Sequence, residues 1–330
     1  MGGVLVDNIV EADGTLHLDQ VGGNALHAAA GARLFLDRVG VVGRVPENYP
    51  MAALDGLDFD LGGIARVPGT RALAEWFFHR ADGSRTDHLH ADASELAEFG
   101  FRQDRLSPTQ SAQWLAHLQA TAAERTGFAQ FRARHPVTPG DVPSGYWNAK
   151  GAHLGANQPT AMLACARAAR AAGLVVTLDP GFRAAEMDAA FLDALLPQLD
   201  AFLPSEKELA VLAPGLGTGP ALAALAKRMS GIVAVKCGSV GAYLHVDGGA
   251  PVLLPAIPVQ ARDPVGAGDA FCGGVLSGLC DGLAPVDAVR RGIVAGSFAV
   301  EAPGVRRFAS LTATDRARRS DQAAQRSTSR

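Results

Sequence analysis

Short apolar runs alternate with longer amphipathic stretches along most of the chain. Apolar runs bounded by Gly, Pro or Asp are typical of buried strands, whereas apolar residues spaced by three and four are typical of helices. This pattern predicts strands at residues 4–10, 39–42, 152–154, 174–179, 201–203, 231–236 and 243–246. It predicts helices from residue 24 and at residues 160–172, 191–199, 221–229, 269–279 and 286–300. Strands that alternate with helices indicate an α/β fold with a doubly wound, mainly parallel sheet flanked by helices.

Three regions depart from this alternation. Residues 64–86 contain alternating, aromatic-rich segments around the turn ADGSR, which predicts a β-hairpin projecting from the main sheet. Residues 101–145 are polar and rich in Pro, with a helical stretch near residues 112–123, and are expected to form a surface insertion. Residues 316–330 are basic and lack periodic apolar positions, so a disordered tail is expected after one domain at residues 1–315.

Composition narrows the class of protein. The chain has 330 residues, of which 48% are hydrophobic and 19% charged, which is typical of a globular protein with a large core. A net charge of -3 gives no basic excess, so we expect no nucleic-acid partner. No stretch of 18 apolar residues suggests a membrane span, and the start of the sequence has no basic flank before an apolar run. A cytoplasmic enzyme is expected.

The four cysteines give no sign of a metal site. They stand apart from one another and form no CxxC pair, so buried reduced thiols are expected rather than a zinc site or a disulfide framework.

The segment DPVGAGDAF, which begins at Asp263, has the composition of a phosphate-binding corner. Its glycines flank Ala267 where an extended segment enters an apolar helix, so successive backbone N–H groups can converge on an anion. Asp269 follows in the first helical turn, where its carboxylate could accept a proton from an attacking hydroxyl. The alternative is a tight turn with Asp269 as a helix cap. The chain contains no GxxxxGK[ST], and GAGDAF lacks the third glycine of GxGxxG, so the P-loop and dinucleotide motifs are excluded.

The sequence DPVGAGDAFCGGVLSGL resembles the C-terminal signature of the ribokinase-like, or PfkB, carbohydrate kinase family. Further segments resemble the family in the family's order: VGGNALHAAAGARLF with VGVVGRV, VVTLDPGFR, AFLPSEKELAVL and VAVKCGSVGAYL. The resemblance implies a doubly wound α/β domain with a small β lid, whose strands fall at roughly residues 4–18 and 64–90. It also implies transfer of the γ-phosphoryl group of ATP to a sugar-like alcohol, with a small-molecule sugar as substrate.

The resemblance assigns roles to particular positions. Asp269 matches the catalytic base, and Gly266, Ala267 and Gly268 match the anion hole. The residues that hold substrate hydroxyls map onto Asp7, Gly23 and Asn24, although Asn24 could instead cap its helix. Arg183 in DPGFR stands near an arginine that in several members faces the phosphate region or an acidic sugar; the alternative is a surface arginine paired with a neighbouring acid.

Nucleotide and metal positions are implied in the same way. Glu208 in SEKE matches the family's glutamate that orders Mg²⁺ through water, or it is only an acid at a helix start. The motif departs from the family at Ser205, where asparagine is usual. Lys236, Gly238 and Gly241 match the strand and loop that line the adenine and ribose pocket. Asp263 matches an aspartate that in many members helps to bind a monovalent cation such as K⁺.

Three functions remain open on the sequence alone. The first is an ATP- and Mg²⁺-dependent sugar kinase. The second is a nucleoside kinase, because the same anion hole serves any primary hydroxyl. The third is a nucleotide- or sugar-binding regulatory protein that has lost efficient catalysis, which the departure at Ser205 and the insertion at residues 101–145 would support. Dimerisation through the lid is a further expectation, because an exposed two-stranded edge tends to be covered.

Overall fold

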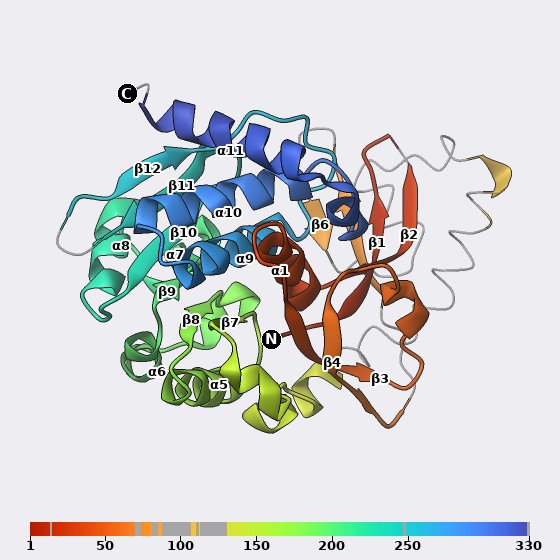
Figure 1. Cartoon of the computed structure of the whole chain (residues 1–330), viewed down its shortest axis with the longest axis horizontal. Helices are drawn as coiled ribbons and strands as arrows, with labels where there is room; N and C mark the ends of the chain where they lie inside the picture. Colours follow the sequence, from red (N-terminus) through yellow and green to blue (C-terminus); the bar gives the residue numbers. More distant parts are fainter. Residues whose placement is uncertain are drawn as a thin grey trace.

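The computed structural model describes residues 1–13, 15–69, 74–80, 85–87, 107–109, 112, 131–246 and 249–328. A six-stranded sheet with the order β12-β11-β10-β9-β8-β7 organises the larger part of the molecule (Figure 1). Its strands are β7 (Gly151–Leu154), β8 (Val175–Leu178), β9 (Ala201–Phe202), β10 (Ile232–Lys236), β11 (Gly241–His245) and β12 (Val252–Pro255). The strands β7 to β10 run parallel, and β11 and β12 are antiparallel additions. The prediction of a mainly parallel sheet is confirmed.

Helices cover both faces of this sheet, as the predicted alternation requires. One hydrophobic core joins β7 to β10 with α5 (Pro159–Ala171), α6 (Ala189–Leu195), α7 (Glu206–Leu212) and α8 (Thr218–Ala226). A second core joins the other face to α9 (Ala267–Cys280) and α10 (Pro285–Ala299). Helix α1 (Asn24–Arg33) packs beside α9 (Figure 1). Because α9 is apolar almost throughout its length, its N-terminus is held rigidly against the sheet.

A separate sheet of four strands, here called the lid sheet, has the order β2-β1-β5-β6. Its strands are β1 (Leu5–Val10), β2 (Leu16–Gly22), β5 (Ala74–His79) and β6 (Arg85–Asp87). The predicted hairpin is confirmed in β5 and β6, which pair antiparallel. The expected lid boundary at residue 64 is wrong, because β4 (Asp60–Val67) pairs in parallel with β3 (Gly40–Pro46) outside the lid sheet. Residues 88–90 lie outside the described residues.

The start of the chain links the strand systems. The amide of Gly2 donates to the carbonyl of Val42 in β3 at 3.0 Å, and the amide of Gly155, which follows β7, donates to the carbonyl of Met1 at 2.9 Å. Residues 1–3 therefore lie between β3 and β7 and continue directly into β1 of the lid sheet. This connection places the first lid strand beside the large sheet.

The expected surface insertion is only partly on the surface. Its helical stretch near residues 112–123 lies largely outside the described residues. In the described part, Phe131, Val137 and Val142 are buried, and the last two pack with Val42. The buried apolar residues attach this Pro-rich segment to the rest of the protein, although their spacing matches neither a strand nor a helix.

The expected disordered tail is wrong, because residues Ala313–Thr328 form helix α11. Its packing depends on a polar residue rather than on an apolar stripe. The Arg319 side chain is 8% exposed, donates to Ser297 Oγ at 2.9 Å and to Glu301 Oε1 at 2.8 Å, and lies over the Phe298 ring. Ala323, one turn further on, is also buried. Because the sequence prediction relied on the spacing of apolar residues, it could not identify an arginine that packs against the core.

Replacing Arg319 by Ala is expected to lower the free energy of unfolding by about 2 kcal/mol, because two charge-assisted hydrogen bonds and a cation–π contact are lost. The measurement is the urea midpoint at constant m-value. The matched control is Arg318→Ala, since the Arg318 side chain is 68% exposed and, among the described residues, forms an ion pair only with Asp315. That change should cost less than about 0.5 kcal/mol. Equal shifts for the two variants would show that α11 is not anchored through Arg319.

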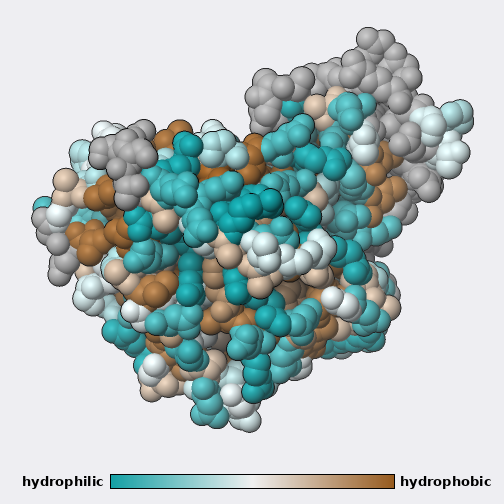
Figure 2. All heavy atoms as spheres, turned by 45° about the horizontal axis from the view of Figure 1, so that its top comes forward, coloured by the Kyte–Doolittle hydropathy of each residue, from teal (hydrophilic) through white to brown (hydrophobic). Residues whose placement is uncertain are grey.

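Polar side chains cover much of the face shown in Figure 2, and apolar side chains form separate patches among them. Among the described residues, no helix is both long enough and apolar enough to cross a membrane.

Candidate active site

Helix α9 begins with the geometry expected of an anion-binding corner. Gly266 is its N-cap residue and adopts a left-handed conformation with φ 72°, and no side chain caps the helix. Ala267 and Gly268 are the first two helical residues, and Asp269 is the third. The first amides of an α-helix lack intrahelical partners, so the Gly268 amide can face an anion, whereas the Ala267 amide donates to the Pro264 carbonyl at 3.3 Å. Asp269 is therefore not the N-cap residue, which removes the simplest structural explanation for its presence.

A buried ion pair lies directly beside this corner. The Lys236 ammonium, at the end of β10, pairs with the carboxylate of Asp179, which follows β8. A Cβ atom built on Gly268 would lie 3.5 Å from Lys236 Nζ, so the ammonium lies next to the helix start. Burial alone lowers the pKa of Lys236, but Asp179, Cys272 and Glu208 together raise it further than burial lowers it. Lys236 is thus a charge at the end of a strand that Asp179 holds beside the start of α9.

Ser205 and Glu208 form a capping box at the start of α7. The Ser205 amide donates to Glu208 Oε2 at 2.6 Å, and Ser205 Oγ accepts from the Glu208 amide at 3.3 Å. Burial raises the pKa of Glu208, and the neighbouring Asp179 raises it further. Glu208 is therefore an acid at a helix start that also stands beside Asp179 and Lys236, and its role toward Mg²⁺ stays a prediction.

Two glycines in the loop after β10 adopt backbone conformations that would be strained in other residues. Gly238 has φ 53° and Gly241 has φ 123°. At Gly241 a Cβ atom would lie 2.1 Å from the Leu254 carbonyl oxygen, whereas Gly238 has open space around it. Gly241 is required because β12 pairs closely with β11 at this point. At Gly238 the absence of a side chain leaves the backbone accessible.

The N-terminal substrate positions are close to one another. Gly23 is the N-cap of α1 with φ 91°, so Asn24 does not cap its helix. Instead Asn24 Oδ1 accepts from the Gly3 amide at 2.7 Å, and its Nδ2 donates to the Ala156 carbonyl at 3.3 Å. Asn24 thus ties the chain start to the loop after β7, which is a structural use of the side chain that sequence reasoning did not foresee.

His27 lies between the Asp7 side chain and Gly266 at the start of α9. The Asp7 side chain is buried, and its Oδ2 lies 4.0 Å from Nε2 of His27 in α1. Gly22 makes room for it, because a Cβ atom there would lie 1.9 Å from Asp7 Oδ2. The His27 ring in turn packs on Gly266, where a Cβ atom would lie 2.1 Å from Nδ1. Burial lowers the pKa of His27 to about 4, although Asp263 opposes this shift.

Asp263 is fully buried at the base of the same corner. Its Oδ1 accepts from the Val265 amide at 2.9 Å and lies 2.9 Å from Nε2 of His79 in β5. Its Oδ2 is buried without a hydrogen-bond partner among the described residues. A carboxylate oxygen left in this way would fit a bound cation.

The Arg183 side chain borders a small cavity next to the start of the chain. The cavity, of about 30 Å³, is bounded by Gly3, Arg44, Arg132, Asn157 and Arg183, among others. Arg44 pairs with Asp141, and Arg183 donates to Glu186 at 2.5 Å. The Arg183 Nε atom is buried without a hydrogen-bond partner within the described ranges.

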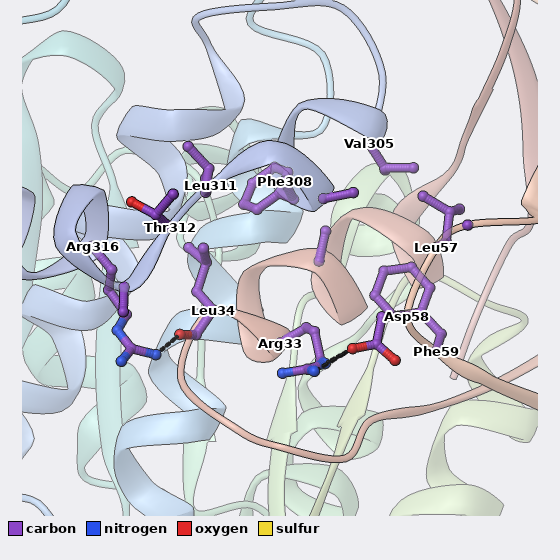
Figure 3. A pocket seen from close by; sticks show the side chains of 14 residues that line it. Arg33, Leu34, Leu57, Asp58, Phe59, Val305, Phe308, Leu311, Thr312 and Arg316 are labelled. Carbon is purple, nitrogen blue, oxygen red and sulfur yellow. Dashed lines mark hydrogen bonds and ion pairs between the residues drawn. The ribbon is translucent and has the colours of Figure 1, made fainter.

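A larger cavity, of about 280 Å³, lies at the other end of α1 (Figure 3). Leu34, Leu57, Phe308 and Leu311 supply apolar surface. The arginines at its edge are engaged, since Arg33 pairs with Asp58 and Arg316 donates to the Leu34 carbonyl. Asn24, which stands at the N-terminal end of α1, takes no part in it. This cavity is separate from the corner at Gly266.

Three side chains of the site were missed by sequence reasoning. Asp179 follows a buried strand, and an acid at the carboxyl end of a parallel strand is a signal that could have identified it. His27 and His79 carried no such signal, because one stands in an Ala-rich helix and the other ends an aromatic strand. Among the described residues, no group of three or more His, Cys, Asp or Glu side chains is arranged to hold a metal ion.

Known proteins resemble this chain in sequence. The family model described as pfkB family carbohydrate kinase matches residues 147–312. The 2-dehydro-3-deoxygluconokinase of Bacillus subtilis is 33% identical over 149 residues, which are 41% of this chain and 43% of that protein. The match therefore spans less than half of that relative's length.

Solved structures resemble the fold. A nucleoside kinase of Burkholderia thailandensis in complex with inosine has a TM-score of 0.69 at 19% identity, covering 98% of this chain and 97% of its own. A putative ribokinase II from E. coli in complex with ATP and Mg²⁺ has a TM-score of 0.67 at 18% identity, with the same coverage. These neighbours confirm the ribokinase-like fold class. Together with the family match over half of the chain, they show that this protein belongs to the pfkB family of carbohydrate kinases, as the sequence resemblance predicted.

Proposed function

We propose that the protein transfers the γ-phosphoryl group of ATP to a hydroxyl group of a small sugar or sugar-like alcohol. The observation that carries this proposal is the start of α9, where Asp269 follows the left-handed turn at Gly266 in a helix that no side chain caps, and Lys236 lies beside Gly268. The acceptor oxygen forms a bond to the γ-phosphorus while the bond from that phosphorus to the bridging oxygen of ADP breaks. The hydroxyl proton passes to Asp269, and ADP leaves.

The electrostatics of the corner support this chemistry. Negative charge spreads over the phosphoryl oxygens during transfer, and preorganised amides stabilise it without reorganisation. Lys236 adds a full positive charge that Asp179 holds in place. We assign Gly266, Ala267 and Gly268 to the anion hole and Asp269 to the base. Lys236, which we predicted to line the adenine pocket, is better placed to face a phosphate, whereas Gly238 and Gly241 keep their proposed place beside the nucleotide.

Mg²⁺ fits the acidic group beside Lys236. Mg²⁺ prefers oxygen ligands and is usually held by one or two carboxylates together with water and substrate phosphates. Glu208, with Ser205 supporting it and Asp179 nearby, offers such a group, and bound Mg²⁺ would supply charge neutralisation at the phosphates. K⁺ near Asp263 is a further proposal that rests on the buried oxygen without a hydrogen bond.

The substrate side is proposed from Asp7, Gly23, Asn24 and Arg183. Asp7 can accept hydrogen bonds from hydroxyls, and Gly23 and Asn24 stand at the start of α1 close to the chain start that Arg183 also borders. The Arg183 Nε atom, which is buried there without a hydrogen-bond partner among the described residues, favours an acceptor with an anionic group, such as a sugar acid. The name of the Bacillus subtilis relative is consistent with this class. A nucleoside is the second candidate, because the Burkholderia thailandensis neighbour was solved with inosine.

A screen of acceptors by ADP release tests the proposal. We expect turnover with neutral sugars, sugar acids or nucleosides, and the highest kcat/KM with a sugar acid. Arg183→Gln should then raise the KM for the acid about tenfold or more, since one charge-assisted hydrogen bond is lost. Arg290→Gln is the matched control, because Arg290 also forms an i,i+3 ion pair, at 2.6 Å. ADP release at background level with every acceptor, together with heat of nucleotide binding, would favour the regulatory protein instead.

The remaining proposals concern the domain organisation, oligomeric state, partners and location of the enzyme. We propose a single domain that includes the lid sheet and α11, dimerisation through the lid sheet, no nucleic-acid partner and a cytoplasmic location. The lid sheet has two edge strands, β2 and β6, which a second copy could cover.

A further inference from the structure

We propose that His79 is a positioning residue that couples the lid sheet to the anion-hole loop, which we define as residues 263–268. This inference rests on the proposed function, because the loop is the one that we assign to phosphoryl binding. Its evidence, however, is a contact between two buried side chains from distant parts of the chain.

The loop depends on the Asp263 carboxylate. Asp263 has no exposed surface, and its Oδ1 accepts from the Val265 amide, one residue before the left-handed Gly266. Its own amide donates to the Val300 carbonyl at 3.1 Å, which attaches the loop to the end of α10. The carboxylate therefore sets the backbone path into the anion hole. Moving it would turn the amides of Ala267 and Gly268.

A buried carboxylate of this kind needs a partner. Transfer of a charged group into the protein interior is costly unless another group compensates it. His79 Nε2 lies 2.9 Å from Asp263 Oδ1, although the two atoms are not oriented as a hydrogen bond, and the His79 side chain is only 8% exposed. Among the described residues, no lysine or arginine forms an ion pair with Asp263. The lid sheet thus places an ionisable ring in contact with the Asp263 carboxylate.

His79 lies at the end of the strand that pairs with β1, and β1 carries the proposed substrate residue Asp7. His79 ends β5, which pairs in parallel with β1 so that Asp7 stands opposite Glu75 and Val10 stands opposite Phe78. Asp7 on β1 is the proposed substrate carboxylate, and it reaches the same loop through His27, which packs on Gly266. Two histidines therefore connect the lid sheet to the loop. A shift of the lid on substrate binding would be transmitted to the anion-hole amides through His79.

Hydrogen exchange measured without any substrate tests the coupling. His79→Leu removes the polar contact at similar volume, and we expect the amides of residues 265–268 to exchange about tenfold faster or more, with β7 to β10 unchanged. His79→Gln keeps an N–H group near the Nε2 position and should stay within about threefold of the wild type. The control is His245→Leu, because His245 is also a buried histidine but lies at the far end of β11.

Turnover gives the second readout, with the best acceptor from the screen. His79→Leu should lower kcat about tenfold or more while the KM for the acceptor changes less than about threefold, and His79→Gln should recover most of kcat. If His79→Leu does not fold, Asp263→Asn takes its place and should also speed exchange at residues 265–268.

Two results would overturn the proposal. One is exchange in the loop that is unchanged in both His79→Leu and Asp263→Asn. The other is acceleration across the whole molecule that matches His245→Leu. An inactive wild type with normal coupling in exchange would instead count against the proposed function alone.

Discussion

Asp269→Asn is expected to lower kcat by about 10²- to 10⁴-fold, which is the usual contribution of a positioned general base. The asparagine keeps the size of the side chain but cannot take the proton of the acceptor hydroxyl. Binding of an ATP analogue should change little, because the amides of residues 266–268 and Lys236 remain in place. Single-turnover ADP formation and calorimetric titration with the analogue measure the two effects separately.

The control for Asp269→Asn is Asp287→Asn. Asp287 is also an acid in the first turn of a long helix, α10, and its side chain is 51% exposed and paired with Arg290. If Asp269 acted only through the helix dipole, both variants would lose stability of about 0.3–1 kcal/mol and leave kcat intact. A normal kcat in Asp269→Asn would remove the residue from the mechanism.

The sequence predicted the parts of the fold that depend on local periodicity. The strands β7 to β11 and the helices α5, α9 and α10 coincide closely with predicted segments, because each combines an apolar run with a clear turn signal. The strand β12 was missed, since it is a four-residue strand at the edge of the sheet and too short to show a clear alternation. Helix α11 was predicted as disordered, because its buried positions are an arginine and an alanine rather than a hydrophobic stripe.

The site was predictable where one short segment holds its chemistry. Gly266, Ala267, Gly268 and Asp269 are contiguous, so their arrangement follows from one turn and one helix start. Pairs from distant segments were not predictable, because the pairing of strands decides which side chains meet. Asp179 and Lys236 come together only because β8, β9 and β10 are neighbours in the sheet. His79 and Asp263 meet only because the lid sheet reaches the start of α9.

Gly266→Ala is expected to disable the anion hole, and Gly282→Ala is its matched control. Both glycines have φ 72°, so both alanines carry the same left-handed backbone penalty of about 1–2 kcal/mol. They differ in their surroundings. A Cβ atom at Gly266 would lie 2.1 to 2.3 Å from three atoms of the buried His27 ring, whereas nothing lies within 4 Å of one at Gly282. We expect kcat to fall about 10²- to 10³-fold in Gly266→Ala only, because the displaced amides no longer face the phosphoryl group.

The double variant Gly266→Ala/His27→Ala separates the clash from the backbone strain. Removing the ring opens space for the new methyl group, so the backbone can return to its path and part of kcat should recover relative to Gly266→Ala. The single variant His27→Ala shows how much His27 contributes by itself, and the interaction between the two changes follows from the complete cycle. Losses that simply add would mean that the ring is not what displaces the loop. Because Gly282→Ala fixes the cost of the left-handed alanine, any further loss of stability in Gly266→Ala measures the contact between Gly266 and His27.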